Sequence, residues 1–394
     1  MTTPSANLGL PSPDPDSLAH SQRVQKALVE LIGAYPNGIP FSAYMQWVLY
    51  EPGLGYYSAG NTKLGAAGDF VTAPEVSPLF GGVIARQCEQ VLDQLGGGTI
   101  VEFGAGTGVL AEMVLSGLRS IDQLERYVIV EVSADLKERQ KARLQSLPAA
   151  LLDKVEWASD PAALQVDGVL IANEVLDALA TERFRIGPDG EALQQYIVLD
   201  DGGALATVWR TADPSLASAV TDLRSKLGYD LPVGYTSEWC ASLEGVLDAM
   251  SAVVKRGAVL LADYGYGRRT YYAPDRVDGT LTCHFRHHVH GDPLVYPGIQ
   301  DLTAWVDFSR VAERLDERGM RYCGFTTQAE FLLRGGLPEL LLDAGPESQA
   351  ELSRGVKTLT LPGEMGERFK FIGFQRDCDV QLSGFSGRDF GRLL

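Results

Sequence analysis

The stretch Thr99-Ile-Val-Glu-Phe-Gly-Ala-Gly-Thr-Gly-Val-Leu most strongly constrains the fold of this 394-residue chain. Apolar and β-branched residues predict a buried strand up to Glu102, and three glycines at alternate positions predict a tight turn into a helix. Glycine tolerates positive φ and has no Cβ, so a ligand can lie against the backbone of Gly104, Gly106 and Gly108. Open α/β sheets bind their ligands at the carboxyl ends of the strands, where this loop lies.

Two classes of cofactor bind to such a strand, glycine loop and helix. The frame Gly106, Gly108, Ala111 satisfies the dinucleotide pattern G-x-G-x-x-A, so the loop alone leaves NAD(P) open. Glu102 favours S-adenosylmethionine, because an acid at this position can hold the amino group of an amino-acid tail, which NAD lacks. Glu131 ends the next apolar strand and is expected to accept both ribose hydroxyls, a role that either cofactor allows.

The amino-acid composition indicates which kinds of partner the protein can bind and in which cellular compartment it is expected. The chain has 34 basic and 51 acidic residues, and its formal net charge of -17 argues against nucleic acid and favours a cationic substrate. Its five cysteines lack any C-x-x-C pair and indicate reduced thiols. No apolar run approaches the roughly 20 residues of a membrane span. Residues 1–19 contain no Lys or Arg, unlike a mitochondrial presequence, so we expect a cytoplasmic protein of a bacterial cell.

The order of the predicted elements indicates an α/β fold. Strands and helices alternate from residue 99 to residue 173, which predicts parallel strands joined by right-handed crossovers. A fifth buried strand is expected from residue 257, and two last strands near residues 321–326 and 368–374. These strands would form a seven-stranded sheet with an antiparallel last strand. Antiparallel strands are expected within residues 183–209 and helices over 214–227 and 236–255.

This pattern divides the chain into seven segments. We expect a flexible N-terminal tail (1–20), an N-terminal cap and lid (21–78), the first part of a cofactor-binding core (79–210), a helical insertion (211–250), core strand 5 (251–269), a substrate-facing loop insertion (270–310) and the last core strands and helices (311–394).

A second group of polar residues follows the fourth predicted strand. Asn173 is expected at the cofactor, and Glu174 and Asp177 at the acceptor, because strand ends at one sheet edge converge on the ligand. Helix capping is the alternative role for these two acids. Asp69 lies in a glycine-rich segment and is a third candidate for the acceptor site. Glu75 completes the capping box that begins at Thr72 and is expected to cap the helix through residues 80–95.

The stretch Cys283-His-Phe-Arg-His-His-Val-His-Gly-Asp collects four histidines and a cysteine. Adjacent side chains on a loop or strand point apart, and no second ligand pair occurs at zinc spacing elsewhere. We therefore expect no metal, and interpret the stretch as a substrate-facing loop with one histidine near the pocket.

Several of these motifs together resemble the MidA family of S-adenosylmethionine-dependent methyltransferases. The resemblance rests on the blocks Gly68-Asp-Phe-Val-Thr-Ala-Pro-Glu-Val-Ser, Val101-Glu-Phe-Gly-Ala-Gly-Thr-Gly, Asn173-Glu-Val-Leu-Asp-Ala and Ala262-Asp-Tyr-Gly, in this order. Further blocks are Gly279-Thr-Leu and Asp292-Pro through Asp301-Leu-Thr-Ala-Trp-Val-Asp-Phe, although Trp305 stands where the family usually has His. The likeness covers about residues 21–375.

The resemblance implies a class I, Rossmann-like methyltransferase fold with a helical N-terminal cap and inserted segments that form the substrate wall. It also implies S-adenosylmethionine as cofactor and symmetric dimethylation of a protein arginine, with a core subunit of respiratory complex I as partner. An arginine acceptor needs carboxylates that hold its guanidinium, for which Glu174 and Asp177 are the candidates and Asp69 the reserve. The alternatives are an NAD(P)-dependent oxidoreductase and a non-catalytic assembly chaperone that binds S-adenosylmethionine.

Overall fold

The computed structural model describes residues 9–58 and 72–394, and the chain divides into two compact units. Unit 1 comprises Met1–Phe70, Ala178–Ser242 and Tyr272–Trp305. Unit 2 comprises Val71–Asp177, Leu243–Tyr271 and Val306–Leu394. Both units are discontinuous, because the chain leaves and re-enters each of them.

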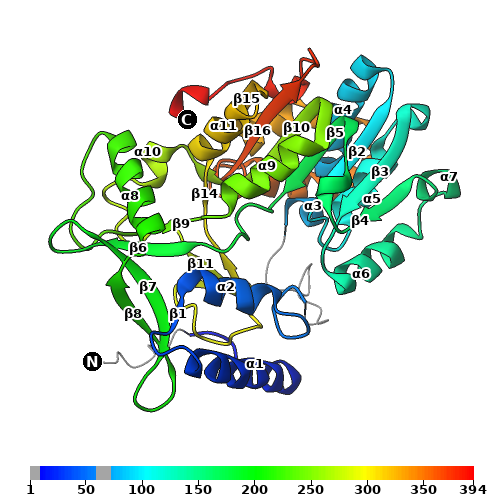
Figure 1. Ribbon diagram of the computed structural model, residues 1–394. Helices are drawn as coiled ribbons and strands as arrows, with labels where there is room; N and C mark the ends of the chain where they lie inside the picture. Colours follow the sequence, from blue (N-terminus) through cyan, green and yellow to red (C-terminus); the bar gives the residue numbers. More distant parts are fainter. Residues whose placement is uncertain (1–8, 59–71) are drawn as a thin grey trace. The chain divides into compact units, whose positions relative to one another are not determined.

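Unit 2 contains the predicted central sheet (Figure 1). Its strands lie in the order β15 (Arg321–Thr327), β16 (Phe369–Arg376), β10 (Val254–Tyr266), β5 (Val166–Asn173), β2 (Gly98–Phe103), β3 (Leu124–Val130) and β4 (Val155–Ala158). The pairs from β10 to β4 are parallel, and β16 is antiparallel to both β10 and β15. This is the predicted seven-stranded sheet with an antiparallel last strand. A short strand, β14 (Val306–Asp307), adds an eighth member beside β10.

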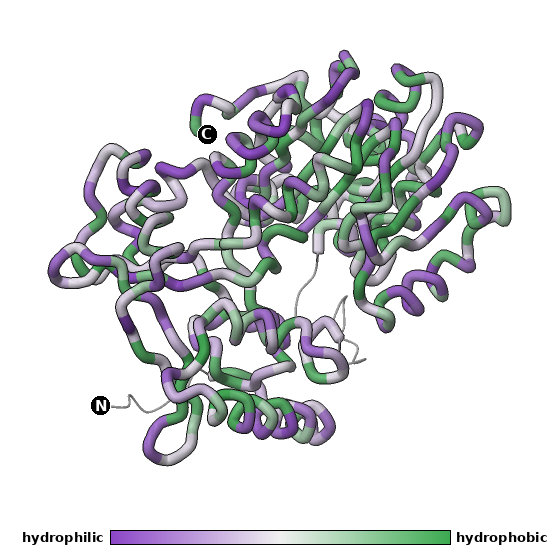
Figure 2. The backbone as a smooth tube through the Cα atoms, in the orientation of Figure 1, coloured by the Kyte–Doolittle hydropathy of each residue, from purple (hydrophilic) through white to green (hydrophobic). Residues whose placement is uncertain are grey.

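Burial on both faces explains why these strands have continuous apolar sequences. On β10, Ala258 and Leu260 belong to the core cluster that also contains much of helix α4 (Pro78–Leu95). The alternate residues Val259 and Leu261 are equally buried, so the sheet is covered on both sides. Figure 2 shows hydrophobic residues concentrated along the central strands of this unit.

Helix α4 illustrates how local sequence sets the limits of an element. The Ser77 hydroxyl accepts the N–H of Leu79 at 3.3 Å, and Pro78 occupies the first helical position, where its missing N–H is not needed. The helix ends at Gly96, whose φ of +81° is the left-handed conformation that glycine adopts readily.

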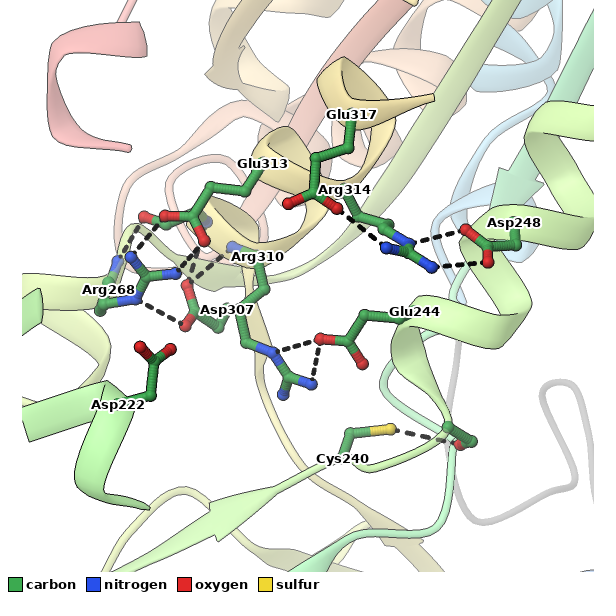
Figure 3. Close-up of polar contacts among 12 residues, drawn as sticks. Asp222, Cys240, Glu244, Asp248, Arg268, Asp307, Arg310, Glu313, Arg314 and Glu317 are labelled. Carbon is green, nitrogen blue, oxygen red and sulfur yellow. Dashed lines mark hydrogen bonds and ion pairs between the residues drawn. The ribbon is translucent and has the colours of Figure 1, made fainter. Parts of the chain in front are cut away.

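Helices α9 (Leu243–Val253) and α11 (Phe308–Glu317) pack on each other and against β10. Ion pairs reinforce this packing (Figure 3). Arg310 contacts Glu244 at 2.6 Å, and both Arg314 and Arg318 donate to the carboxylate of Asp248 at 2.6–2.7 Å. The remaining helices of unit 2 are α3 (Ala73–Val76), α5 (Val109–Gly117), α6 (Ala134–Leu144), α7 (Ala149–Leu152), α10 (Arg268–Tyr271), α12 (Gln328–Arg334), α13 (Leu337–Asp343) and α14 (Pro346–Thr360).

Unit 1 is built on a second, antiparallel sheet. Its path runs β1 (Ile39–Pro40), β7 (Ala192–Leu199), β6 (Glu182–Ile186) and β9 (Thr236–Trp239), with β8 (Leu205–Thr211) paired to β7. The unit also contains helices α1 (Pro15–Gly33), α2 (Phe41–Tyr50) and α8 (Pro214–Leu227). A three-stranded sheet is formed by β12 (His288–His290), β11 (Thr282–Phe285) and β13 (Asp301–Thr303), where the sequence predicted a loop.

Three local predictions need correction. Helix α1 begins at Pro15, within the predicted tail, because the Asp14 carboxylate accepts the N–H groups of Asp16 and Ser17. The predicted helix over 236–255 is strand β9 followed by α9, since Thr236–Trp239 pairs with the distant strand β6. The capping box of Thr72 and Glu75 is present, but it caps the separate short helix α3 rather than α4.

The predicted segment boundaries differ from the observed division, most of all in the two segments that span residues 79–250. Residues 178–210, which were assigned to the core, lie in unit 1, because they form the antiparallel sheet there. The predicted helical insertion over 211–250 is split, with α8 in unit 1 and α9 in unit 2.

Candidate functional site

The glycine loop connects β2 to α5 in unit 2. Gly104, Gly106 and Gly108 all have positive φ, at +64°, +53° and +83°. A Cβ on Gly108 would approach the Cα of Gln140 to 3.3 Å, and a Cβ on Gly104 would approach the Cγ2 of Val175 to 2.8 Å. The loop therefore needs glycine both for its backbone conformation and for close approach to its neighbours.

Glu102 lies within β2 and is almost completely buried. Its Oε2 accepts a hydrogen bond of 2.6 Å from the hydroxyl of Tyr127 on β3. Burial raises the pKa of Glu102 to about 7, and the Tyr127 hydrogen bond opposes this rise. One carboxylate oxygen of the predicted cofactor residue is thus already bound within the protein.

Glu131 follows β3 directly and is connected to the glycine loop through one side chain. Its two carboxylate oxygens accept the Ser133 N–H at 2.8 Å and the Gln140 amide at 2.9 Å. The same Gln140 nitrogen donates to the carbonyl oxygen of Gly106 at 2.9 Å. The Gln140 oxygen in turn accepts from the Trp157 indole at 3.0 Å. Glu131 and the loop are therefore held in one hydrogen-bonded cluster.

Gln140 was not identified from the sequence, although it is fully buried. It lies in the middle of α6, a largely polar helix, and no motif surrounds it. Only the packing of α6 beside β3 and β4 turns its side chain into the link between Glu131 and the loop.

The acidic residues after β5 lie in a turn and not in a helix. We call residues 174–177 the acidic turn. Glu174 has a φ of +54°, which is unusual for a residue with a Cβ. Its Oε1 accepts the Asn173 amide at 2.9 Å and the N–H of Ala73, at the start of α3, at 3.4 Å. Because Val175 of this turn lies against Gly104, the acidic turn and the glycine loop are neighbours at one edge of the sheet.

A buried aspartate on the next strand holds this turn in place. Asp263 lies near the carboxyl end of β10 and is 1% exposed. Its Oδ2 accepts the N–H groups of Leu176 at 2.8 Å and Asp177 at 3.3 Å, and its Oδ1 accepts the N–H of Tyr264 at 2.8 Å. The sequence showed Asp263 only as part of a motif, and its role follows from the pairing of β10 with β5.

The carboxyl groups at this edge favour their neutral forms. Burial, followed by the charge of Asp177, raises the pKa of Glu174 well above its usual range. Burial likewise raises the pKa of Asp263 to about 8, and the charge of Glu174 adds to the rise. In the part of the chain that the structure describes, no Lys, Arg or His forms an ion pair with Glu174 or Asp263. Glu174 therefore has no cationic partner among the described residues.

One further buried acceptor faces the same edge. The Oδ1 of Asn173 has no hydrogen-bond partner among the described residues, although it is buried. Such an atom needs a donor, which a bound ligand can provide. The Glu131 carboxylate and this amide oxygen are hydrogen-bond acceptors at the same edge of the sheet as the glycine loop.

Two predictions on the site are not decided by this geometry. Asp69 lies outside the described residues. The histidine stretch lies in unit 1, where Cys283 and His290 are cross-strand neighbours on β11 and β12. Within residues 9–58 and 72–394, no group of three or more His, Cys, Asp or Glu side chains is arranged to hold a metal ion.

The chain is similar to known proteins over most of its length. A family model described as "Putative S-adenosyl-L-methionine-dependent methyltransferase" matches residues 83–326. "Protein arginine methyltransferase NDUFAF7 homolog, mitochondrial" of Drosophila melanogaster is 31% identical over 386 residues, which cover 90% of this chain and 84% of that protein. The Homo sapiens "Protein arginine methyltransferase NDUFAF7, mitochondrial" is 28% identical over 370 residues, covering 85% of this chain and 79% of that protein.

Two solved structures from Burkholderia thailandensis are also similar. One was determined with bound S-adenosyl-homocysteine and aligns with a TM-score of 0.90 at 38% identity. The other is a native structure with a TM-score of 0.88 at 37% identity. Both alignments cover 98% of this chain and 100% of the other. No helix in the described part of the chain combines the length and apolar composition needed to cross a membrane.

Proposed function

The chain belongs to the family of S-adenosyl-L-methionine-dependent methyltransferases described above, and from this premise we propose that it methylates an arginine guanidinium in a protein. The cofactor is S-adenosylmethionine, and the enzyme transfers its methyl group, so the NAD(P) alternative is set aside. One observation supports the choice of acceptor. Carboxyl groups gather at the ends of β5 and β10, and neither Glu174 nor Asp263 forms an ion pair with a described residue. The arginine methyltransferase names of the relatives agree with this choice.

Residues of the glycine-loop cluster are the proposed cofactor site. Glu131 would accept the ribose hydroxyls, and the backbone of Gly104, Gly106 and Gly108 would pass close to the ligand. Glu102 and Asn173 would lie toward the amino-acid tail, where the open Asn173 Oδ1 offers an acceptor for an ammonium group. The Tyr127 hydrogen bond holds Glu102 in place and leaves it one oxygen for this contact.

Glu174 and Asp177 would hold the acceptor. A guanidinium is protonated at all working pH values, and two carboxylates can grip it through paired N–H donors. Binding the cation would favour the ionised form of Glu174, because an opposite charge offsets the effect of burial on its pKa. Held in this way, the reacting nitrogen is aligned with the methyl group and shielded from water, which is the main task of a methyltransferase. Asp69 remains a further candidate for this role.

The finer identity of the substrate rests on the family resemblance. It supports a core subunit of respiratory complex I as the methylated partner and symmetric dimethylation as the product. The net charge of -17 favours steering of a basic segment toward the enzyme and disfavours nucleic acid. A cytoplasmic location stays a prediction from the sequence.

Labelling in a lysate tests the proposal. The purified protein is incubated with methyl-labelled S-adenosylmethionine and lysate of a strain that lacks its gene, and the labelled band is analysed by mass spectrometry. We expect label on an arginine of one protein, and far less label with the Glu174→Gln variant. Label on lysine, on a carboxylate or on a small molecule would overturn the arginine assignment. Cofactor binding without any labelled product would favour the assembly-chaperone alternative.

A further inference from the structure

Asp263 is a buried carboxylate that contacts the acidic turn only through backbone groups. Its Oδ2 accepts from both Leu176 and Asp177, and its Oδ1 accepts from Tyr264 in its own strand. A buried carboxyl group that accepts several N–H groups holds the peptide units that donate them, because each hydrogen bond that is lost inside the protein is costly. Asp263 therefore fixes the second half of the turn to the end of β10.

The first half of the turn is attached to the same place. The N–H of Glu174 donates to the carbonyl oxygen of Ala262 at 2.9 Å, and Asn173 and Ala262 are register partners in the pairing of β5 with β10. Glu174 keeps its φ of +54° in this arrangement. Such a conformation persists only where the surrounding contacts impose it. Residues 262 and 263 thus fasten the acidic turn at both of its ends.

We propose that Asp263 is the positioning residue of the methyl-acceptor site: it holds the acidic turn in the conformation that presents Glu174 and Asp177 to the acceptor. The proposal rests on the proposed function, because it assumes that these two acids contact the substrate. Asp263 itself contacts backbone N–H groups and acts through the turn.

The arrangement explains why an acid occupies a position that is 1% exposed. An apolar residue of similar size would remove the acceptor of two buried hydrogen bonds and of a partly buried one, and each loss is unfavourable. The neighbouring cation, Lys370, is the register partner of Asp263 on β16, but its ammonium group donates to the carbonyl oxygens of Glu367 and Arg368 and lies 4.4 Å from the Tyr266 ring centroid. Backbone N–H groups are thus the hydrogen-bond partners that the structure gives to Asp263.

The test compares Asp263→Asn with Glu174→Gln and with the double variant. Asn replaces one oxygen with an NH₂ group, so at least one of the three N–H groups loses its acceptor. We expect kcat for the protein substrate to fall on the order of 10–100-fold, because a small misplacement of the groups that hold a substrate lowers the rate by this much. The dissociation constant of S-adenosyl-homocysteine, measured by calorimetry, should stay within about twofold, because Asp263 has no hydrogen bond to a residue of the proposed cofactor site.

A double-mutant cycle separates positioning from general damage. If Asp263 acts through the turn, then adding Asp263→Asn to Glu174→Gln should lower kcat by much less than it does in the parent enzyme. If the fold-decreases in kcat of the two single variants multiply in the double variant, Asp263 acts independently of Glu174, and the proposal is overturned.

Glu89→Gln is the matched control. Glu89 is also a buried acid, 4% exposed, that accepts the backbone N–H groups of Arg119 and Ser120, but these residues follow α5 at the end away from the glycine loop. This variant should lose thermal stability and keep kcat. Equal loss of kcat in both variants would make the effect of Asp263→Asn a stability effect.

A more conservative variant protects the test against misfolding. If Asp263→Asn is not recovered as folded protein, Asp263→Glu serves instead, since it keeps the carboxyl group and moves the acceptor oxygens by one methylene. We expect it to bind S-adenosyl-homocysteine and to have a lowered kcat. If Glu174→Gln lowers kcat but neither Asp263 variant does, the positioning role is wrong and the proposed function stands. If Glu174→Gln and Asp177→Asn both leave kcat unchanged, the proposed acceptor site is itself wrong.

Discussion

The hydroxyl of Tyr127 donates a 2.6 Å hydrogen bond to Oε2 of Glu102 inside the core of unit 2. The bond joins neighbouring strands, β3 and β2, and both side chains are buried. Burial raises the pKa of Glu102 from 4.5 to about 7. The carboxyl group that is predicted to lie at the cofactor tail is therefore also a group whose protonation is linked to folding.

This linkage gives a prediction on stability as a function of pH. The folded protein binds a proton at Glu102 up to about pH 7, whereas the unfolded chain releases it near pH 4.5. The free energy of unfolding should therefore fall as the pH rises through this window. The Glu102→Gln side chain does not titrate. The difference in the free energy of unfolding, variant minus parent, should therefore rise on the order of 1–3 kcal/mol between pH 5 and pH 8. Urea denaturation without cofactor measures it, and a difference independent of pH would contradict it.

The glycine loop gives a prediction on cofactor binding. In Gly106→Val a branched side chain would occupy the space of the ligand against the backbone, so binding of S-adenosylmethionine should be abolished while the protein stays folded. The φ of +53° adds strain of about 1–2 kcal/mol. Gly96→Val is the control, because Gly96 has a φ of +81° at the end of α4 and an open surrounding. It should lose similar stability and bind S-adenosyl-homocysteine normally. Unchanged affinity in Gly106→Val would remove the loop from the site.

Glu131 gives a prediction that distinguishes the ribose from the sulfonium end of the cofactor. Glu131→Ala should weaken S-adenosylmethionine and S-adenosyl-homocysteine alike by about 1–3 kcal/mol, as expected for a lost charged acceptor. Glu156→Ala, which removes an exposed acid on the neighbouring strand β4, should bind both ligands like the parent. Calorimetry with each ligand measures the effect. If only one ligand were affected, Glu131 would lie near the sulfonium instead.

The acidic turn gives a prediction on turnover. Glu174→Gln and Asp177→Asn keep shape but remove charge, so the affinity for S-adenosylmethionine should be nearly unchanged. Turnover on the protein substrate should fall by orders of magnitude, because the cationic acceptor loses its partners in a water-poor site. Loss of cofactor binding with normal turnover at saturation would assign these acids to the cofactor. If both quantities were unchanged, the acceptor site would have to be sought elsewhere, with Asp69 as the first candidate.

The ion pairs between α9 and α11 give a prediction on acid stability. The Arg314 and Arg318 guanidinium groups hold the pKa of Asp248 at about 2, below its usual 3.8. The stabilisation is present above pH 3.8 and is lost as the pH falls toward 2. Asp248→Asn should lower the melting temperature at neutral pH, and high salt should reduce the difference, because these charges are partly exposed. A melting temperature equal to that of the parent at low salt would contradict this prediction.

Much of unit 2 could be predicted from the sequence because its information is local. The apolar run before Glu102, the alternate glycines and the alternation of strand and helix each lie within a few neighbouring residues, and each reflects backbone preference and burial. The same reasoning placed Glu131, Glu174 and Asp177 at strand ends, where the parallel sheet does collect them.

Prediction was weaker where partners are distant in the chain. Thr236–Trp239 forms a strand because β6 pairs with it, and its own sequence was taken for the start of a helix. The boundary between the units at Asp177 was also not predicted, because which sheet a strand joins depends on its pairing partner and not on its own residues.

The sequence by itself determined the fold class and the strand ends at which the chemistry is expected, since periodicity, glycine positions and acids at strand ends are local properties. The glycine loop alone left two cofactors open, and the choice of S-adenosylmethionine came from Glu102 and the family resemblance. Only the tertiary structure decided how these groups are held. Gln140 joins Glu131 to the glycine loop, and Asp263 fastens the acidic turn, through hydrogen bonds between residues that are 9 to 87 positions apart. Such contacts depend on how β5, β10 and α6 pack, and no local pattern in the chain encodes them.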